Sequence, residues 1–219
     1  LNGPESCIKR RKRNIMTQKE RQERSRQMIF QAALEEFGTS EPESVTMDEI
    51  CAKHGISKGM LYHYYAGKDP LFLACVEQVF QSLAQLSLQL ADQCSCPGAR
   101  LSIRYYFSAR EAYFAKNPLE KGVFESALLH TPAHLAQDIQ RLRAPLLQAN
   151  RCFFEKILAD APLRPGLDRE QTLVYLEAVE ESFWAMLRRC CTAAPPGESQ
   201  PDLWRSRLLD LILFGVFSA

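Results

Sequence analysis

Helical spacing is the feature of this 219-residue sequence that most constrains its fold. In nearly every long segment, apolar residues recur at every third or fourth position, and no run of alternating apolar and polar residues marks a strand. Proline and glycine interrupt the pattern between segments. The sequence therefore predicts an all-α protein of about nine helices.

The expected helices divide into two groups. Four N-terminal helices are predicted at about 21–37, 46–54, 57–65 and 68–90. Five more are predicted at about 99–116, 118–129, 132–160, 168–191 and 201–217. The expected domains are an N-terminal arm or extension over 1–16, a small unit of short helices over 17–66 and a helical body over 67–219.

The start of the second helix carries the clearest local signal. Thr46 and Glu49 have the spacing of a capping box, in which the hydroxyl accepts from the Glu49 amide and the Glu49 side chain reaches back. Val45 and Ile50 flank the box as a hydrophobic staple. A helix is therefore predicted to begin at Thr46.

A short turn separates this helix from the next one. Gly55 is suited to the left-handed conformation that closes a helix, and Ser57 offers a new N-cap. Two short helices joined by a turn of about three residues have the layout of a helix-turn-helix.

Residues 46–72 resemble the helix-turn-helix of TetR-family transcriptional regulators. The shared residues are Thr46, Ile50, Ala52, Gly55, Ile56, Ser57, Gly59, Leu61, Tyr62, Tyr64, Tyr65, Lys68 and Leu71. The resemblance implies an N-terminal DNA-binding domain followed by a helical ligand-binding and dimerisation domain. The rest of the chain matches the family in architecture only.

The candidate DNA-binding residues follow from this resemblance. They are Thr46, Ser57, Lys58, Gly59, Met60, Tyr62, His63 and Lys68. The resemblance implies phosphate contacts for Thr46, Tyr62 and Lys68 and base reading for Lys58 and His63. The alternative is a purely structural three-helix unit in which Tyr62, Tyr64 and Tyr65 are core aromatics.

Two residues of the third helix bear on DNA approach. Glycine is unfavourable within a helix, but Gly59 lacks the side chain that would hold the backbone away from DNA. Met60 stands where the family often has a small or polar residue, so we expect an apolar contact with a thymine methyl group.

The last two predicted helices are apolar on more than one face. The excess surface suggests burial against a second copy of the chain, and the resemblance also implies a homodimer. The expected interface residues are Leu176, Phe183, Trp184, Trp204, Leu208, Leu211 and Ile212. The alternative is that both helices are simply central to the body.

Aromatic residues are frequent between the fourth helix and these last two. The resemblance implies an effector pocket here, and aromatic walls suit an apolar or cationic small molecule. The candidates are Tyr105, Tyr106, Tyr113, Phe124 and Phe153. Membership of an ordinary core is the alternative for most of them.

Charge is concentrated at the N-terminus. The whole chain has a formal charge of only +1, but residues 1–26 hold nine basic and three acidic side chains. The most basic stretch, residues 9–13, is either a disordered arm that reaches phosphates or the minor groove, or part of an extension over residues 1–15 that is not native to the protein.

Several other classes of protein are not indicated. The longest uninterrupted apolar run has seven residues, at 211–217, and no secretory signal is evident, so a cytoplasmic protein without membrane association is expected. No nucleophile, base and orienting group occur together, and no cofactor or metal is expected. His130 and His134 have ligand spacing but no completing residues, and a redox or metal role for Cys94, Cys96, Cys190 and Cys191 has no complete ligand set.

The sequence therefore predicts a TetR-like repressor that binds palindromic operator DNA as a dimer and releases it when a small molecule binds. The alternative is a DNA-binding architectural or adaptor protein of the same fold without an effector. A body without a cavity would favour the adaptor, whereas a closed pocket of a few hundred Å³ would count against it.

Overall fold

The computed structural model describes residues 17–93, 98–159, 161–163, 165–193 and 210. Within these ranges the chain is helical and contains no strand, which confirms the predicted all-α class. The helices are α1 (Gln18–Thr39), α2 (Met47–His54), α3 (Lys58–Tyr64), α4 (Lys68–Gln93), α5 (Ala99–Lys116), α6 (Pro118–Leu129), α7 (Ala136–Leu158) and α8 (Arg169–Ala193). The helix predicted at 201–217 lies outside the described residues, apart from residue 210.

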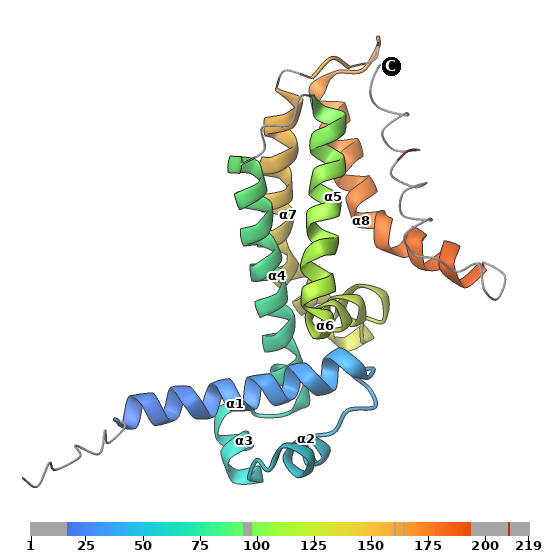
Figure 1. Cartoon of the computed structure of the whole chain (residues 1–219). Coiled ribbons are helices and arrows are strands. Elements are labelled where there is room, and N and C mark those ends of the chain that lie inside the picture. Colours follow the sequence, from blue (N-terminus) through green and yellow to red (C-terminus); the bar gives the residue numbers. More distant parts are fainter. Residues whose placement is uncertain (1–16, 94–97, 160, 164, 194–209, 211–219) are drawn as a thin grey trace, which may run out of the picture.

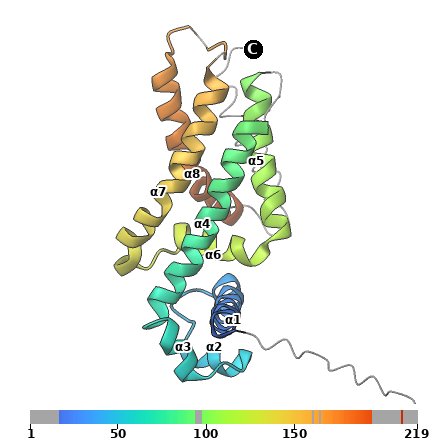
Figure 2. The ribbon, with the colours of Figure 1, turned by 90° about the vertical axis from the view of Figure 1, so that its left-hand side faces the viewer.

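The helices form a small unit at one end and a longer body. Figure 1 shows α1 lying across the base of the body, with α2 and α3 beyond it, while α4, α5 and α7 run along the body. The view in Figure 2, turned by 90°, also places α2 and α3 at the end of the molecule. The helix-turn-helix is thus presented at a free end.

Helix α4 belongs to both parts. Near its start, the ring of Phe72 packs edge-on against Phe37 of α1, with centroids 5.1 Å apart. Two turns later Phe80 packs against Phe124 of α6, with centroids 6.1 Å apart. The apolar stripe of α4 continues to Leu90 and is buried mainly against α7.

Helix α4 is also long and apolar enough, by length and composition alone, to cross a membrane, and no other helix in the described ranges is. Its sequence has no long uninterrupted apolar run, because Glu77 and Gln78 follow the apolar residues 71–76. Half of the most apolar stretch of α4 is buried inside the protein. Burial in a core accounts for the same composition.

The local signals around α2 and α3 are confirmed. Thr46 Oγ1 accepts from the Glu49 amide at 3.2 Å, and Glu49 accepts from the Thr46 amide at 3.1 Å. Gly55 has φ of 63°, the left-handed conformation that ends α2, and Ser57 caps α3. These contacts fix the angle between the two short helices.

Two boundaries differ from the prediction. Helix α1 begins at Gln18 rather than near Arg21, because Thr17 and Glu20 form a second capping box that the sequence analysis did not identify. The helix predicted at 132–160 begins with a 3₁₀ turn over Ala133–Leu135, and α7 proper starts at Ala136.

Two glycines let α1 and α6 approach closely. A Cβ atom on Gly122 of α6 would lie 2.0 Å from the carbonyl oxygen of Gly38, near the end of α1. A Cβ atom on Gly38 would in turn lie 2.6 Å from the carbonyl oxygen of Leu119. Since these neighbours are backbone atoms, only glycine fits without moving a helix. This crossing joins the N-terminal unit to the body.

Gly122→Ala should therefore force α1 and α6 apart. We expect it to lower the free energy of unfolding by about 1–3 kcal/mol, as overpacked sites do. Urea unfolding followed by circular dichroism measures the change. Gly59→Ala is the matched control because a Cβ atom there meets nothing within 4 Å. Equal stability of Gly122→Ala and the unchanged protein would contradict the close approach.

Candidate functional site

Helix α3 is held by its inner face and its first turn. The Leu61 side chain is completely buried, and Tyr64 donates from its hydroxyl to the Gln22 carbonyl of α1 at 3.2 Å. Ser57 Oγ accepts from the Met60 amide at 3.2 Å, which satisfies one of the free N–H groups of the first turn. These contacts position α3 against α1 and leave its other face uncovered.

The uncovered face carries four of the predicted DNA-binding residues. Lys58, Gly59, Tyr62 and His63 are all exposed, and half of the Tyr62 surface is accessible. Met60 lies at the edge of this face, half-buried and packed against the core. The alternative in which Tyr62, Tyr64 and Tyr65 are all core aromatics is therefore wrong for Tyr62. Tyr64 and Tyr65 are partly buried and pack against the core.

Lys58 has a partner that the sequence analysis did not identify. Its Nζ lies 2.7 Å from Oδ2 of Asp48 in α2, and this hydrogen bond raises the pKa of Lys58. Both side chains are well exposed, so water screens their attraction. Lys58 is thus charged, and it can exchange Asp48 for another acceptor at small cost.

Thr46 and Lys68 lie next to one loop. Thr46 is exposed, and its hydroxyl is used in the cap of α2, 3.2 Å from the Glu49 amide. Lys68, the first residue of α4, donates from Nζ to the Glu43 carbonyl at 3.2 Å. The start of α4 is thereby fixed beside the segment that leads into α2.

A charged cluster fixes α2 on α1. Glu36 of α1 receives Lys53 Nζ at 2.6 Å and His54 Nε2 at 3.0 Å, both from the end of α2. The hydrogen bond from Lys53 is the largest influence that lowers the pKa of Glu36, against a smaller opposing effect of burial. Sequence spacing did not reveal this cluster because Glu36 is 17 residues before Lys53.

In the described part of the structure, the five aromatic residues predicted to line an effector pocket are not gathered around one described cavity. Tyr106, Phe124 and Phe153 are fully buried, and Tyr106 stacks on Phe153 with centroids 4.9 Å apart. Tyr105 is 42% exposed, and Tyr113 hydrogen bonds to Glu120. None of the five lines either of the two cavities described next. Tyr106, Phe124 and Phe153 therefore belong to the packed core of the body and not to the wall of a described cavity.

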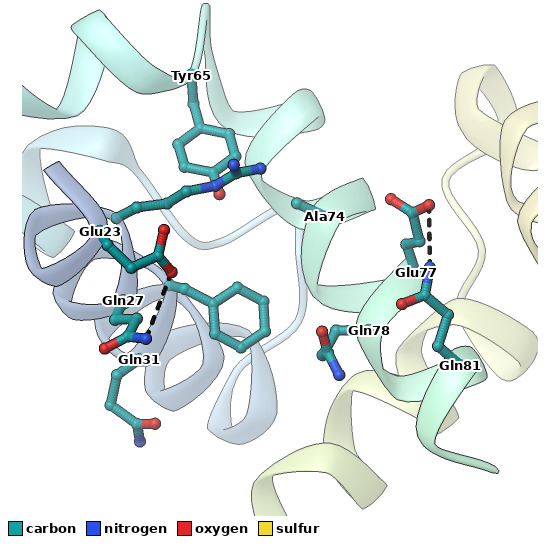
Figure 3. Close-up of a pocket in the computed structure, with 10 residues that line it drawn as sticks. Glu23, Gln27, Gln31, Tyr65, Ala74, Glu77, Gln78 and Gln81 are labelled. Atoms are coloured by element: carbon teal, nitrogen blue, oxygen red, sulfur yellow. Dashed lines mark hydrogen bonds between the residues drawn. The ribbon is translucent and has the colours of Figure 1, made fainter. Parts of the chain in front are cut away.

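The first cavity is a groove of about 540 Å³ between α1 and α4, the α1–α4 groove. Figure 3 shows glutamine and glutamate side chains on both walls, with Tyr65 at one end. Gln27 donates to Glu23 at 3.4 Å, and Gln81 donates to Glu77 at 3.3 Å. Because most of its lining side chains are glutamine, glutamate or arginine, the groove offers little contact surface to a small apolar molecule.

The second cavity lies in the body and has a volume of about 350 Å³. It is formed by α7 and α8, and we call it the α7–α8 cavity. Its lining residues are Ala144, Leu147, Gln148, Asn150, Arg151, Phe154, Glu177 and Glu180. Sequence analysis missed all of them, because their convergence depends on how α8 packs against α7.

The predicted dimer residues need correction. Leu176 and Phe183 are buried within a single chain, where Phe183 lies 4.7 Å from Phe107 between ring centroids. They belong to the core of the body because they lie on the inner face of α8. The side chain of Trp184, and residues Trp204, Leu208, Leu211 and Ile212, lie outside the described part of the structure. Among the side chains of α8 that the structure describes, Val174 and Tyr175 are exposed apolar residues, at 56% and 44%.

The paired histidines contact different carboxylates. His134 Nε2 lies 2.9 Å from Asp69 at the start of α4, and His130 lies 3.8 Å from Glu41. In the described ranges, no group of three or more His, Cys, Asp or Glu side chains is placed to hold a metal ion. Burial raises the pKa of the Cys75 thiol to about 12. Cys94 and Cys96, and the side chains of Cys190 and Cys191, lie outside the described part of the structure.

Comparison with known proteins bears on the helix-turn-helix first. Residues 29–75 match the family model described as "Bacterial regulatory proteins, tetR family". This range runs from the buried half of α1 into α4, and so contains the capped helices and the exposed face of α3.

Curated relatives extend the likeness into the body. The chain is 22% identical to the HTH-type transcriptional regulator BetI of Rhizobium meliloti over 170 residues, which is 78% of this chain and 80% of that protein. It is 25% identical to BetI of Brucella suis over 117 residues, which cover 53% of this chain and 57% of the relative.

Solved structures share the fold over most of the chain. A tetR-family regulatory protein from Rhodococcus RHA1 superposes with a TM-score of 0.60 at 19% identity, covering 89% of this chain and 98% of that one. The ketosteroid regulator KstR2 of Mycobacterium tuberculosis gives 0.59 at 16% identity, covering 90% and 96%. The capped helix-turn-helix, the match of residues 29–75 to the tetR family model and the regulator relatives together support a TetR-family transcriptional regulator.

Proposed function

We propose that this regulator is a cytoplasmic repressor without enzymatic activity that binds a palindromic operator as a homodimer. A small molecule bound in the body would release it from DNA. The observation that carries the proposal is the uncovered face of α3, where Lys58, Gly59, Tyr62 and His63 face away from the protein at a free end of the molecule. The named relatives support regulation at DNA, and the residue roles are our own inference.

In the proposed complex, α3 enters the major groove with its first turn toward the base edges. Lys58 leaves Asp48 and donates to a guanine, while His63 reads a neighbouring base. Tyr62, Thr46 and Lys68 contact phosphates and fix the register of the protein on the duplex. Gly59 allows the backbone to come close, and the half-buried Met60 offers an apolar contact.

The second copy of the chain would pack on α8. Exposed Val174 and Tyr175 lie on the outer face of this helix, since Leu176 and Phe183 occupy its inner face. Isolated exposed apolar residues are common, but two adjacent ones on a helix of 25 residues offer a surface for an isologous contact. We propose residues 17–66 as the DNA-binding domain and the body from 67 onward as the dimerisation domain.

The alternative, an adaptor without an effector, depends on a body without a cavity. The α7–α8 cavity lies within the usual volume range of small-molecule sites, and it supports a ligand-responsive regulator. Helix α4 gives a route for the response because it packs on α7 and leads back to α3. A ligand acts through this route only if it binds the two states with different affinity.

Selection of bound sequences from a random pool of duplex DNA tests the proposed function. We expect an enriched palindrome, bound by two chains per duplex and released by a ligand of the body. Recovery of sequences no better bound than the starting pool would exclude a specific operator-binding repressor.

Lys58 and Lys68 should affect the binding of that operator differently. Lys58→Ala should relax the preference at one base pair, because it removes a base contact. Lys68→Ala should weaken all sequences alike and reduce the slope of log affinity against log salt by about 1, because it removes a phosphate contact. Binding isotherms at several salt concentrations measure both. Lys121→Ala, on α6, is the control, and identical behaviour of all three variants would contradict the assigned roles.

Gly59→Ala separates stability from DNA binding. Alanine favours the helix, and a Cβ atom has open space here, so folding should be unaffected or slightly improved. Operator affinity should nevertheless fall about tenfold or more, the equivalent of about 1.4 kcal/mol, because the added methyl group holds the backbone off the DNA. Unchanged operator affinity would show that the backbone does not approach DNA at this residue.

Val174→Glu should weaken the homodimer. A charge on the outer face of α8 would have to be desolvated in the proposed contact, which is costly without a partner. Sedimentation equilibrium should show a dissociation constant raised at least tenfold. Leu88→Glu is the matched control, since Leu88 is a 46% exposed residue of α4. An equal effect of both substitutions, or none, would argue against this interface.

A further inference from the structure

A network of buried polar side chains crosses the core of the body. Arg110 of α5 donates to the Tyr106 hydroxyl at 2.8 Å and to the Glu180 carboxylate of α8. Ser87 of α4 donates to Asn150 Oδ1 of α7 at 2.7 Å. These side chains are at most 3% exposed. Polar groups buried so completely have to satisfy one another, because water does not reach them.

The donors and acceptors in this network can be assigned in order, starting from Arg110. A guanidinium group only donates, so the Tyr106 oxygen is the acceptor. Burial raises the pKa of Tyr106 to about 12, and its hydroxyl therefore keeps a proton and interacts with the Ser87 hydroxyl. Ser87 in turn gives its own proton to Asn150 Oδ1. With this assignment, the amide oxygen of Asn150 accepts from Ser87, and the NH₂ group of Asn150 has no acceptor.

That NH₂ group belongs to a residue that lines the α7–α8 cavity. Asn150 is 2% exposed, and its Nδ2 has no hydrogen-bond partner among the described residues. An unpaired buried donor costs free energy, which a bound acceptor would recover. The side chain is fixed for this purpose, because Ser87 holds the other end of the amide.

The acidic groups of the same cavity already have partners. Glu180 accepts from Arg110, and Glu177 receives Arg151 Nη1 at 3.1 and 3.3 Å. A cationic ligand would have to compete with these arginines for the carboxylates. The cavity thus presents a donor without a partner and two carboxylates that have partners, which favours an acceptor on the ligand. Leu147 and Phe154 supply apolar contact beside it.

We propose that the α7–α8 cavity binds a small molecule with an apolar part and a carbonyl or carboxylate oxygen, which accepts a hydrogen bond from Asn150 Nδ2. The binding site itself follows from the body alone. Its role as the effector site rests on the proposed function, and Asn150 on α7 lies close to α4 through Ser87. The sequence analysis favoured an apolar or cationic effector. The ion pairs of Glu177 with Arg151 and of Glu180 with Arg110 disfavour a cationic ligand in this cavity.

Three probes with the same ring and chain test the head group. They are 4-phenylbutanamide, 4-phenylbutanoate and 4-phenylbutylamine, titrated to millimolar concentration into ¹⁵N-labelled full-length protein. The amide and the carboxylate should shift the side-chain NH₂ signals of Asn150, which are assigned by their loss in Asn150→Asp. The amine should bind at least tenfold more weakly. Failure of the first two to bind, or preference for the amine, would overturn the proposal.

Asn150→Asp should reverse this preference. The substitution keeps the shape but puts an acceptor where the free donor was, so affinity for the carboxylate should fall at least tenfold and affinity for the amine should rise. Gln140→Glu is the matched control, because it makes the same chemical change at an exposed position of α7. Equal affinities of Asn150→Asp and the unchanged protein would place the probes elsewhere.

Asn150→Leu covers the case in which a buried carboxylate prevents folding. It removes the donor without adding charge, and circular dichroism establishes that the helices are retained. Binding of 4-phenylbutanamide should still fall at least tenfold, and unchanged binding would overturn the proposal. Operator affinity without probe is measured in parallel. Protein that binds the probes but no operator refutes the repressor and keeps the site, whereas the opposite result refutes the site.

Discussion

One continuous helix is the constraint on which the rest of the structure depends. Helix α4 places Phe72 against Phe37 of the N-terminal unit and Phe80 against Phe124 of the body, so two cores share one rigid element. Burial of apolar surface drives both contacts, and a helix of 26 residues transmits position along its length. The angle of the helix-turn-helix relative to the body is therefore a property of how α4 packs.

The crossing of α1 and α6 at Gly38 and Gly122 is the second link between the two parts. Its backbones touch without intervening side chains, so a movement of α6 is passed to α1 with little room for adjustment. The unit that carries the uncovered face of α3 is thus held by two stiff contacts. The proposed release from DNA depends on such contacts, because a ligand in the body would act on DNA only through differences in helix position.

The two proposed sites, the face of α3 and the α7–α8 cavity, differ in how their polar groups are paired. The face of α3 is polar, exposed and weakly paired, as the ion pair of Lys58 with Asp48 illustrates, so its groups can exchange partners on DNA. The polar groups beside the α7–α8 cavity are buried, and Arg110, Tyr106 and Ser87 hold each other in fixed directions. Fixed donors of this kind discriminate between ligands by the penalty for an unsatisfied group.

Local features, which depend only on neighbouring residues along the chain, could be predicted from the sequence. The Thr46 capping box, the left-handed Gly55 and the Ser57 cap were predictable because each uses backbone groups only a few residues away. They in turn identified the helix-turn-helix and its exposed residues. The packing of the body helices on one another determines which of their faces are covered. It buries Leu176 and Phe183 inside one chain, and it places Tyr106, Phe124 and Phe153, which were expected to line a pocket, in the core. It also brought Ser87 to Asn150 across 63 residues, since close packing between helices is not encoded by spacing within them.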